Sequence, residues 1–205
     1  PIGLNSVKSK NLQKSDFISK DKTQNTSVIG IIEGKIITEH IHEDIPVING
    51  DKSPDVSRDL VRVSVIERHG KNNNIANGFV RGFGLKKGAV ASTVAHDHHN
   101  IVSIGIEYED MVIACNRIKE IEGGFVIASQ GKIISELPLP IAGLMSLESF
   151  EVVRDQLIEL RKSAKDLGII LEEPFLQLAF LALPVIPSLK ITDQGLVDVE
   201  KFRII

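Results

Sequence analysis

The chain has little cysteine and no long apolar run, and both absences narrow its class. Among its 205 residues there is one cysteine, Cys115, which excludes an internal disulfide and fits a reducing compartment. No apolar run reaches the roughly 18 residues of a membrane span, and no signal peptide opens the chain. We therefore expect a cytoplasmic protein with no membrane association. The chain begins at Pro1 rather than Met, which indicates processing or a fragment of a longer protein.

Charge of either sign is also not in large excess. The formal net charge is -3 at pH 7, so nothing favours sequence-independent attraction to phosphate backbones. Nucleic acid is accordingly not an expected partner. Hydrophobic residues make up 42% of the chain, which is enough to bury the core of one large domain, or of one domain with a small appendage.

Composition divides the chain into a tail and a domain. Residues 1–26 hold few apolar side chains and many Lys, Ser and Asn, which predicts a flexible tail or linker. Residues 27–205 form the predicted domain. Residues 27–39 open it with a predicted hairpin, because β-branched runs flank Glu33 and Gly34.

The rest of the domain alternates between β-rich runs and two amphipathic helical patterns. Further strands are predicted at residues 59–68, 89–94, 100–106, 125–128 and 132–137. Alternation in the first of these indicates a sheet with one solvated face. Helices are predicted over 108–121 and 146–167, the second capped by Ser146 and Gly168. The apolar run 175–187 fits either a buried strand or a short helix. The sum is an α+β fold with mixed or antiparallel sheet layers and two main helices.

A cluster of histidines lies between two of the predicted strands. His96, His98 and His99 are three of the six histidines in the chain, and Asp97 stands among them. A neutral imidazole can bind a metal or act as an acid or base near neutral pH, and a carboxylate can fix its tautomer. On an extended backbone, His96 and His98 would share one face, and Asp97 and His99 the other. We predict a functional site here, with a hydrogen-bonded structural corner as the alternative.

Other suggestive residues have plainer interpretations. His40 and His42 could begin a binuclear metal site, but the further ligands are missing, and a (β/α)8 barrel needs about 250 residues. His69 follows a strand in an Asn-rich loop, where a solvated role is as reasonable as a functional one. Cys115 falls on the apolar face of a predicted helix and is expected in the core. Three spaced glycines predict turns rather than a nucleotide site, namely Gly82, Gly84 and Gly88.

Six blocks of sequence, taken together and in order, are specific to one family. They are VIERH at 65–69, GFVRGFGLKKGAVASTVAHDHHN at 78–100, EDM at 109–111, LPLPIAGLMS at 137–146, PFLQLAFLALPVIP at 174–187 and KITDQGLVDV at 190–199. These blocks resemble the C-terminal domain of bacterial and archaeal adenine deaminases, which belong to the amidohydrolase superfamily. The resemblance covers roughly residues 27–200.

The resemblance implies a metal-dependent hydrolase of purine metabolism and purine salvage, which converts adenine and water to hypoxanthine and ammonia. A divalent metal pair, of manganese or iron, is implied in an N-terminal barrel that this chain lacks. There, a metal-activated hydroxide would attack the purine carbon that bears the amino group. The implied partners are that barrel, in the same or a separate chain, adenine, and further copies in a homo-oligomer. By itself the chain is expected to be inactive.

The family motif His-Asp-Ser-His-Asn carries over to His96, Asp97, His99 and Asn100. His98 stands where the family usually has Ser, which weakens a metal pair of His96 and His98. The implied role of the four matching residues is a wall of the purine pocket or a surface that fixes assembly. As metal ligands His96, His98 and His99 remain candidates. The alternatives are a non-catalytic purine- or metal-binding and assembly module, and a structural domain that shields barrel surface.

Overall fold

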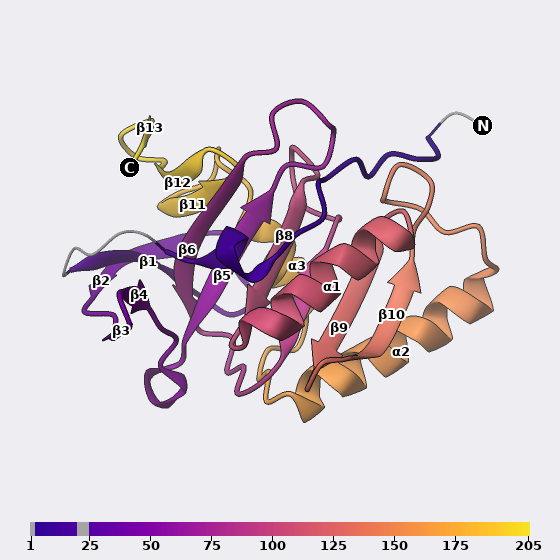
Figure 1. Cartoon of the computed structure of the whole chain (residues 1–205), viewed down its shortest axis with the longest axis horizontal. Coiled ribbons are helices and arrows are strands. Elements are labelled where there is room, and N and C mark those ends of the chain that lie inside the picture. Colours follow the sequence, from indigo (N-terminus) through magenta and orange to yellow (C-terminus); the bar gives the residue numbers. More distant parts are fainter. Residues whose placement is uncertain (1–2, 20–24) are drawn as a thin grey trace.

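An eight-stranded mixed sheet runs through the middle of the molecule (Figure 1). The structure is a computed structural model that describes residues 3–19 and 25–205. All neighbouring strands of this sheet are antiparallel except β1 and β6, which are parallel. In sheet order the strands are β10 (Lys132–Pro138), β9 (Gly124–Ser129), β7 (Ala89–Ser92), β8 (Ile101–Gly105), β5 (Leu60–Ile66), β6 (Ile75–Arg81), β1 (Thr26–Ile31) and β2 (Thr38–Glu43).

Helices cover both faces of the sheet, which confirms the α+β class. One face lies under α1 (Tyr108–Glu120), and the other carries α2 (Phe150–Asp166) and α3 (Pro174–Phe180). Strand alternation sorts the side chains, because Val90 packs in the α2 and α3 core while Ala89 packs under α1. The α+β prediction with helices beside a mixed sheet is therefore correct, and α3 adds a third helix. In the parts of the chain that the structure describes, no helix is long and apolar enough to cross a membrane.

Small elements complete the fold at the periphery. The β11–β12–β13 sheet lies close to β6, whereas β3 and β4 form a separate hairpin. The sequence reasoning did not predict these strands or β6. Their bounds, with the two 3-10 helices, are β3 (Val47–Ile48), β4 (Asp51–Lys52), β11 (Leu189–Thr192), β12 (Gly195–Asp198), β13 (Arg203–Ile204), η1 (Lys14–Phe17) and η2 (Val56–Arg58).

Local patterns placed most of the large elements correctly. The two predicted hairpins are present as β1 with β2 and as β9 with β10, although β2 runs from Thr38 to Glu43, beyond the predicted limit at residue 39. The apolar run near the C-terminus resolves as a short helix, α3. The start of α2 differs, because Ser149 rather than Ser146 is the N-cap and accepts a hydrogen bond from the Val152 amide, 3.5 Å away. Gly168 follows the end of α2 in a left-handed conformation, as a C-terminal cap requires.

The predicted solvated face of β5 is wrong. Every residue from Leu60 to Ile66 is buried. The strand lies between β8 and β6 in the sheet, and both of its faces are covered, so even its polar positions point into packed surroundings. Arg62 is buried with an ion pair to Asp51 at 3.1 Å, and Ser64 donates a hydrogen bond to Asn77 Oδ1 at 2.7 Å. Alternation of polarity along a strand does not reveal how its partners cover it.

The N-terminal segment packs more closely than its composition predicted. Val7, Leu12 and Phe17 are buried in the cluster beneath α1. The backbone N–H of Leu12 donates to Oδ1 of Asn116 in α1 at 2.9 Å, and Nδ2 of Asn116 donates to the Leu12 carbonyl at 3.0 Å. Three apolar anchors suffice here because the folded domain supplies the other side of each contact. Residues 3–19 therefore bury more apolar surface than their composition indicated, while the flexible tail or linker over residues 1–26 stays a prediction.

Candidate functional site

The histidine cluster forms a tight turn between β7 and β8, and we call residues 96–100 the histidine turn. The amide of His99 donates to the carbonyl of Ala95 at 2.8 Å, and His99 has a left-handed backbone with φ of 50°. The expectation that His96 and His98 share one face rested on an extended backbone, and the chain forms a turn here instead. Instead the rings of His96 and His99 come together, with centroids 6.1 Å apart.

Residues that follow β5 hold the histidine turn in place through its backbone. The ring Nε2 of His69 donates to the carbonyl of His98 at 2.8 Å, and Arg68 Nε donates to the carbonyl of His99. The Arg68 amide also donates to Asn100 Oδ1 at 3.3 Å. Arg68 and His69 therefore fix two adjacent carbonyls of the histidine turn and the side chain of Asn100.

Arg68 is a residue that the sequence reasoning missed. Its side chain is only 2% exposed, and its remaining donors reach the Ser6 carbonyl at 3.2 Å, Ser6 Oγ at 3.1 Å and the Ala142 carbonyl at 2.9 Å. All of these acceptors are neutral, and no carboxylate among the described residues pairs with it. Burial lowers the pKa of Arg68 to about 10. A largely uncompensated positive charge therefore lies directly beneath the histidine turn.

Glu67 shapes the loop that presents His69. The carboxylate is 3% exposed and accepts backbone hydrogen bonds over distances of 2.5 to 3.3 Å. The donors are the amides of His69, Lys71, Asn72 and Asn73. Burial by itself raises the pKa of Glu67, but these amides stabilise the charged form, and the pKa is lowered. His69 is thus an exposed residue whose ring also supports the histidine turn.

Asn100 links the turn to the hairpin between β11 and β12. Its Nδ2 donates to Asp193 Oδ1 at 3.2 Å, and Asn74 Nδ2 approaches the other oxygen of Asp193 at 3.4 Å. The backbone N–H of Asn100 donates to Nδ1 of His98 at 3.2 Å. Because that nitrogen accepts, the proton of a neutral His98 ring belongs on Nε2. Asn100 therefore fixes both a distant loop and the tautomer of its neighbour.

The rings of the histidine turn are incompletely paired, and those of His98 and His99 are neutral. Burial lowers the pKa of His98, and burial followed by the positive charge of Arg68 lowers the pKa of His99. Both rings are consequently uncharged at neutral pH. Nδ1 of His96, Nδ1 of His99 and Nε2 of His98 are buried without a hydrogen-bond partner in the described residues. Asp97 is exposed and makes no hydrogen bond with these rings in the same part of the chain.

A metal site is not assembled by this cluster alone. Across residues 3–19 and 25–205, no group of three or more His, Cys, Asp or Glu side chains is arranged to hold a metal ion. The residues present therefore do not fit the metal pair that the family resemblance implies. A metal role for His96, His98 or His99 stays a prediction that would require ligands from another part of the enzyme.

The plainer interpretations agree with the structure. His40 and His42 stack on one another with centroids 4.7 Å apart, and His40 Nε2 lies 2.9 Å from Ser27 Oγ. Cys115 is fully buried, and burial raises the pKa of its thiol to about 12, so the thiol stays protonated.

The spaced glycines form turns that wrap carboxylates. The amides of Gly82 and Gly84 donate to the two oxygens of Asp59 at 3.0 and 2.7 Å. The amide of Gly88 donates to Glu107 Oε2 at 2.7 Å. Each glycine has a positive φ, so the turn role is confirmed.

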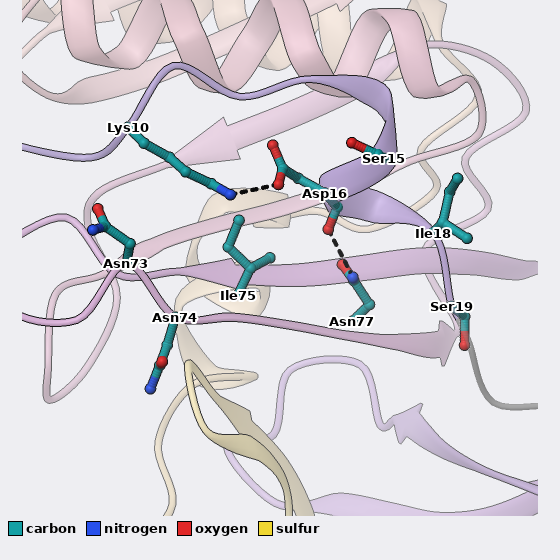
Figure 2. Close-up of a pocket in the computed structure, with 9 residues that line it drawn as sticks. All are labelled: Lys10, Ser15, Asp16, Ile18, Ser19, Asn73, Asn74, Ile75 and Asn77. Atoms are coloured by element: carbon teal, nitrogen blue, oxygen red, sulfur yellow. Dashed lines mark hydrogen bonds and ion pairs between the residues drawn. The ribbon is translucent and has the colours of Figure 1, made fainter.

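A polar hollow of about 560 Å³ lies elsewhere, between the N-terminal segment and the start of β6 (Figure 2). Lys10 Nζ pairs with Asp16 Oδ1 at 2.6 Å, and Asn77 Nδ2 donates to the Asp16 carbonyl at 2.9 Å. These lining groups satisfy one another, and no residue of the histidine turn lines the hollow. The histidine turn therefore remains the candidate site.

Comparison with known proteins agrees with the resemblance in the six blocks. The sequence profile described as "Adenine deaminase C-terminal domain" matches residues 35–203. The chain belongs to the adenine deaminase C-terminal domain family. Proteins named adenine deaminase are 57% identical over 205 residues in Cereibacter sphaeroides strain ATCC 17025 and 58% identical over 205 residues in Brucella anthropi. A third, from Brucella abortus strain 2308, is 58% identical over 204 residues.

Each of these adenine deaminases is much longer than the matched segment. The whole chain aligns, yet it spans only 36% of the Cereibacter and Brucella anthropi proteins and 35% of the Brucella abortus protein. In this family member, the histidine turn and its supports at Glu67, Arg68 and His69 all fall inside the matched residues 35–203. One sequence signal could have identified Arg68. In the block VIERH, Glu67 and Arg68 directly follow an apolar strand, and charged side chains that are buried at such a position need hydrogen-bond partners.

Proposed function

We propose that this chain serves as the C-terminal domain of an adenine deaminase and that its histidine turn forms part of the wall of the purine pocket. The observation that carries this proposal is a turn with a fixed backbone, in which each imidazole ring has one buried nitrogen without a hydrogen-bond partner among the described residues. The backbone of the turn is fixed at the His98 and His99 carbonyls, whereas His96 Nδ1 and His99 Nδ1 have no hydrogen-bond partner in residues 3–19 and 25–205. A binding site needs this combination of a preorganised backbone and unpaired polar groups.

The ring chemistry suits a purine. A neutral imidazole offers one N–H donor and one acceptor, and adenine carries ring nitrogens that accept and an amino group that donates. Burial, followed by the positive charge of Arg68, lowers the pKa of His99, so this ring can play both roles at neutral pH. Asn100 holds the turn rather than the ligand, because its side chain is already engaged by Asp193 and the Arg68 amide. Asp97, which is exposed, is free to face the incoming domain.

The hydrolytic step itself belongs to the part of the enzyme outside this chain. A divalent metal pair, of manganese or iron, would be held there, since the described residues offer no three-ligand set. The contribution of this chain is to bind and orient the purine and to exclude water from one side of the pocket. A homo-oligomer and a cytoplasmic location complete the proposal.

A chimera tests the proposal directly. The matching segment of the Cereibacter sphaeroides enzyme is replaced by this chain, and ammonia release from adenine is measured for the chimera and for the chain alone. We expect turnover by the chimera and none by the chain. In the chimera, His99→Ala should lower kcat/KM at least tenfold with an unchanged melting temperature.

Matched controls separate a pocket role from a structural one. His98→Ser, which introduces the residue usual in the family, should leave turnover within about twofold, because that position contacts the turn and not the purine. Equal loss of stability and activity in His99→Ala would indicate a structural corner. Tight adenine binding by the chain alone, without turnover in the chimera, would favour a purine-binding module.

A further inference from the structure

An apolar loop connects β10 to α2 and runs into the first turn of that helix. Its most exposed apolar side chains are Met145 at 57%, Leu147 at 69% and Phe150 at 76% exposure, and Val152 follows at 40%. Polar residues surround them, with Glu148, Glu151 and Arg154 exposed on the same stretch. An apolar centre with a charged rim is the usual anatomy of a protein interface. We call residues 141–152, which end in the first three residues of α2, the apolar loop.

The apolar loop is held rigidly from below. Ile141 and Met145 exchange two backbone hydrogen bonds, both of 3.1 Å. The carbonyl of Ala142 accepts from Arg68, and the carbonyl of Gly143 accepts from Thr93 Oγ1 at 2.7 Å. A loop that is anchored in this way loses little conformational freedom when a partner covers it. Exposure of large apolar side chains here is therefore not explained by a mobile, unpacked segment.

The start of the described chain lies against the same loop. The carbonyl of Gly3 accepts a hydrogen bond from the Ala142 amide at 2.7 Å, and Figure 1 shows the N-terminal end beside the segment between β10 and α2. The family is a C-terminal domain, and the relatives are longer by nearly two thirds of their length. A preceding catalytic portion would therefore enter the domain next to the apolar loop.

We infer that the apolar loop is the docking surface for the catalytic portion of the adenine deaminase, an inference that rests on the proposed function. Phe150 and Leu147 are its central anchors, since buried aromatic and aliphatic side chains carry most of the affinity of an interface. Arg68 bonds to both the Ala142 and His99 carbonyls, so the loop and the histidine turn belong to one rigid unit. Docking at the loop would then set where the turn lies over the purine.

Hydrogen exchange in the same chimera tests this without relying on activity. Amides of the apolar loop should exchange at least tenfold more slowly in the chimera than in the isolated chain. Phe150→Ser should abolish that protection in the chimera while leaving the urea midpoint of the isolated chain unchanged. Phe202→Ser is the matched control, because Phe202 is 85% exposed near the C-terminus, and it should keep the protection.

Three outcomes would overturn the inference. Equal exchange of the loop in the chimera and the isolated chain means that nothing docks there. Protection that Phe150→Ser leaves intact means that another surface is responsible. Protection in the isolated chain that disappears on dilution, together with a dimer in sedimentation, means that a second copy covers the loop. An inactive chimera whose loop is protected would contradict the proposed function alone.

Discussion

The guanidinium of Arg68 donates a hydrogen bond from Nη2 to the carbonyl oxygen of Ala142, 2.9 Å away. The same side chain donates from Nε to the carbonyl of His99, so one buried cation joins the histidine turn to the loop before α2. Its other end reaches Ser6 in the N-terminal segment. Three parts of the chain that are distant in sequence thus depend on a single side chain.

Replacing Arg68 by Met should destabilise the domain substantially. The change leaves the carbonyls of Ser6, Ala142 and His99 without their donor, and each buried unpaired group costs about 1 to 3 kcal/mol, although removal of a buried charge offsets part of this. We expect a net loss of about 2 to 4 kcal/mol in the free energy of unfolding, measured by urea denaturation.

Two further substitutions define how that loss arises. Arg68→Lys keeps the charge but cannot span the same acceptors, so it should also lose more than about 1 kcal/mol. Arg154→Met is the exposed comparison, because Asp155, itself exposed, is the only ion-pair partner of Arg154 among the described residues, and the change should alter stability by less than about 0.5 kcal/mol. An Arg68→Met variant with unchanged stability would show that the hydrogen bonds of Arg68 do not stabilise the fold.

Adding a methyl group at Gly143 should be costly for a steric reason. Gly143 has φ of 71°, and a Cβ there would lie 2.9 Å from Nη2 of Arg68. Gly34 has the same φ of 71° but nothing within 4 Å of an added Cβ. Both Ala substitutions carry the backbone strain of a left-handed residue, roughly 1 kcal/mol, and only Gly143→Ala adds the clash. We expect the melting temperature of Gly143→Ala to fall clearly below that of Gly34→Ala. Equal melting temperatures would show that the Arg68 side chain moves aside at no cost.

Lys190 should make the stability rise with pH on the alkaline side. It is fully buried with its Nζ on the carbonyls of Ile36 at 2.7 Å and Phe180 at 3.0 Å, and burial lowers its pKa from 10.5 to about 8. Below about pH 8 the amine is protonated in both the folded and the unfolded chain, and the folded chain carries the burial penalty. Between about 8 and 10.5 only the unfolded chain keeps the proton, so the free energy of unfolding increases with pH.

Comparison with Lys190→Met isolates this effect. Urea denaturation of both proteins between pH 7.5 and about 10 should give a steeper rise for the chain with lysine, by at most about 1.4 kcal/mol per pH unit for one proton. The other titrating groups are shared, so the difference between the two curves reports Lys190. Parallel curves would mean that the pKa of the buried amine is not lowered.

Local sequence determined the elements whose pattern repeats along the chain. The spacing of three and four placed α1 within one residue of its observed limits, and Gly168 marked the end of α2. Flanking β-rich runs also placed the histidine turn between two strands. The same patterns predicted a start of α2 at Ser146 instead of Ser149. The two serines lie three positions apart and are equally good N-caps by local sequence, so the conformation of the preceding loop decides between them.

Only the tertiary structure decided which residues support the histidine turn. Arg68 and Ser6 are 62 positions apart, Arg68 and Ala142 are 74 apart, and Asn100 and Asp193 are 93 apart. The burial of β5 on both faces and of Phe17 beneath α1 depends on the same long-range packing. Local sequence determines backbone preferences over a few residues, whereas the partner of a buried polar group is determined by which distant segments the folded core brings together.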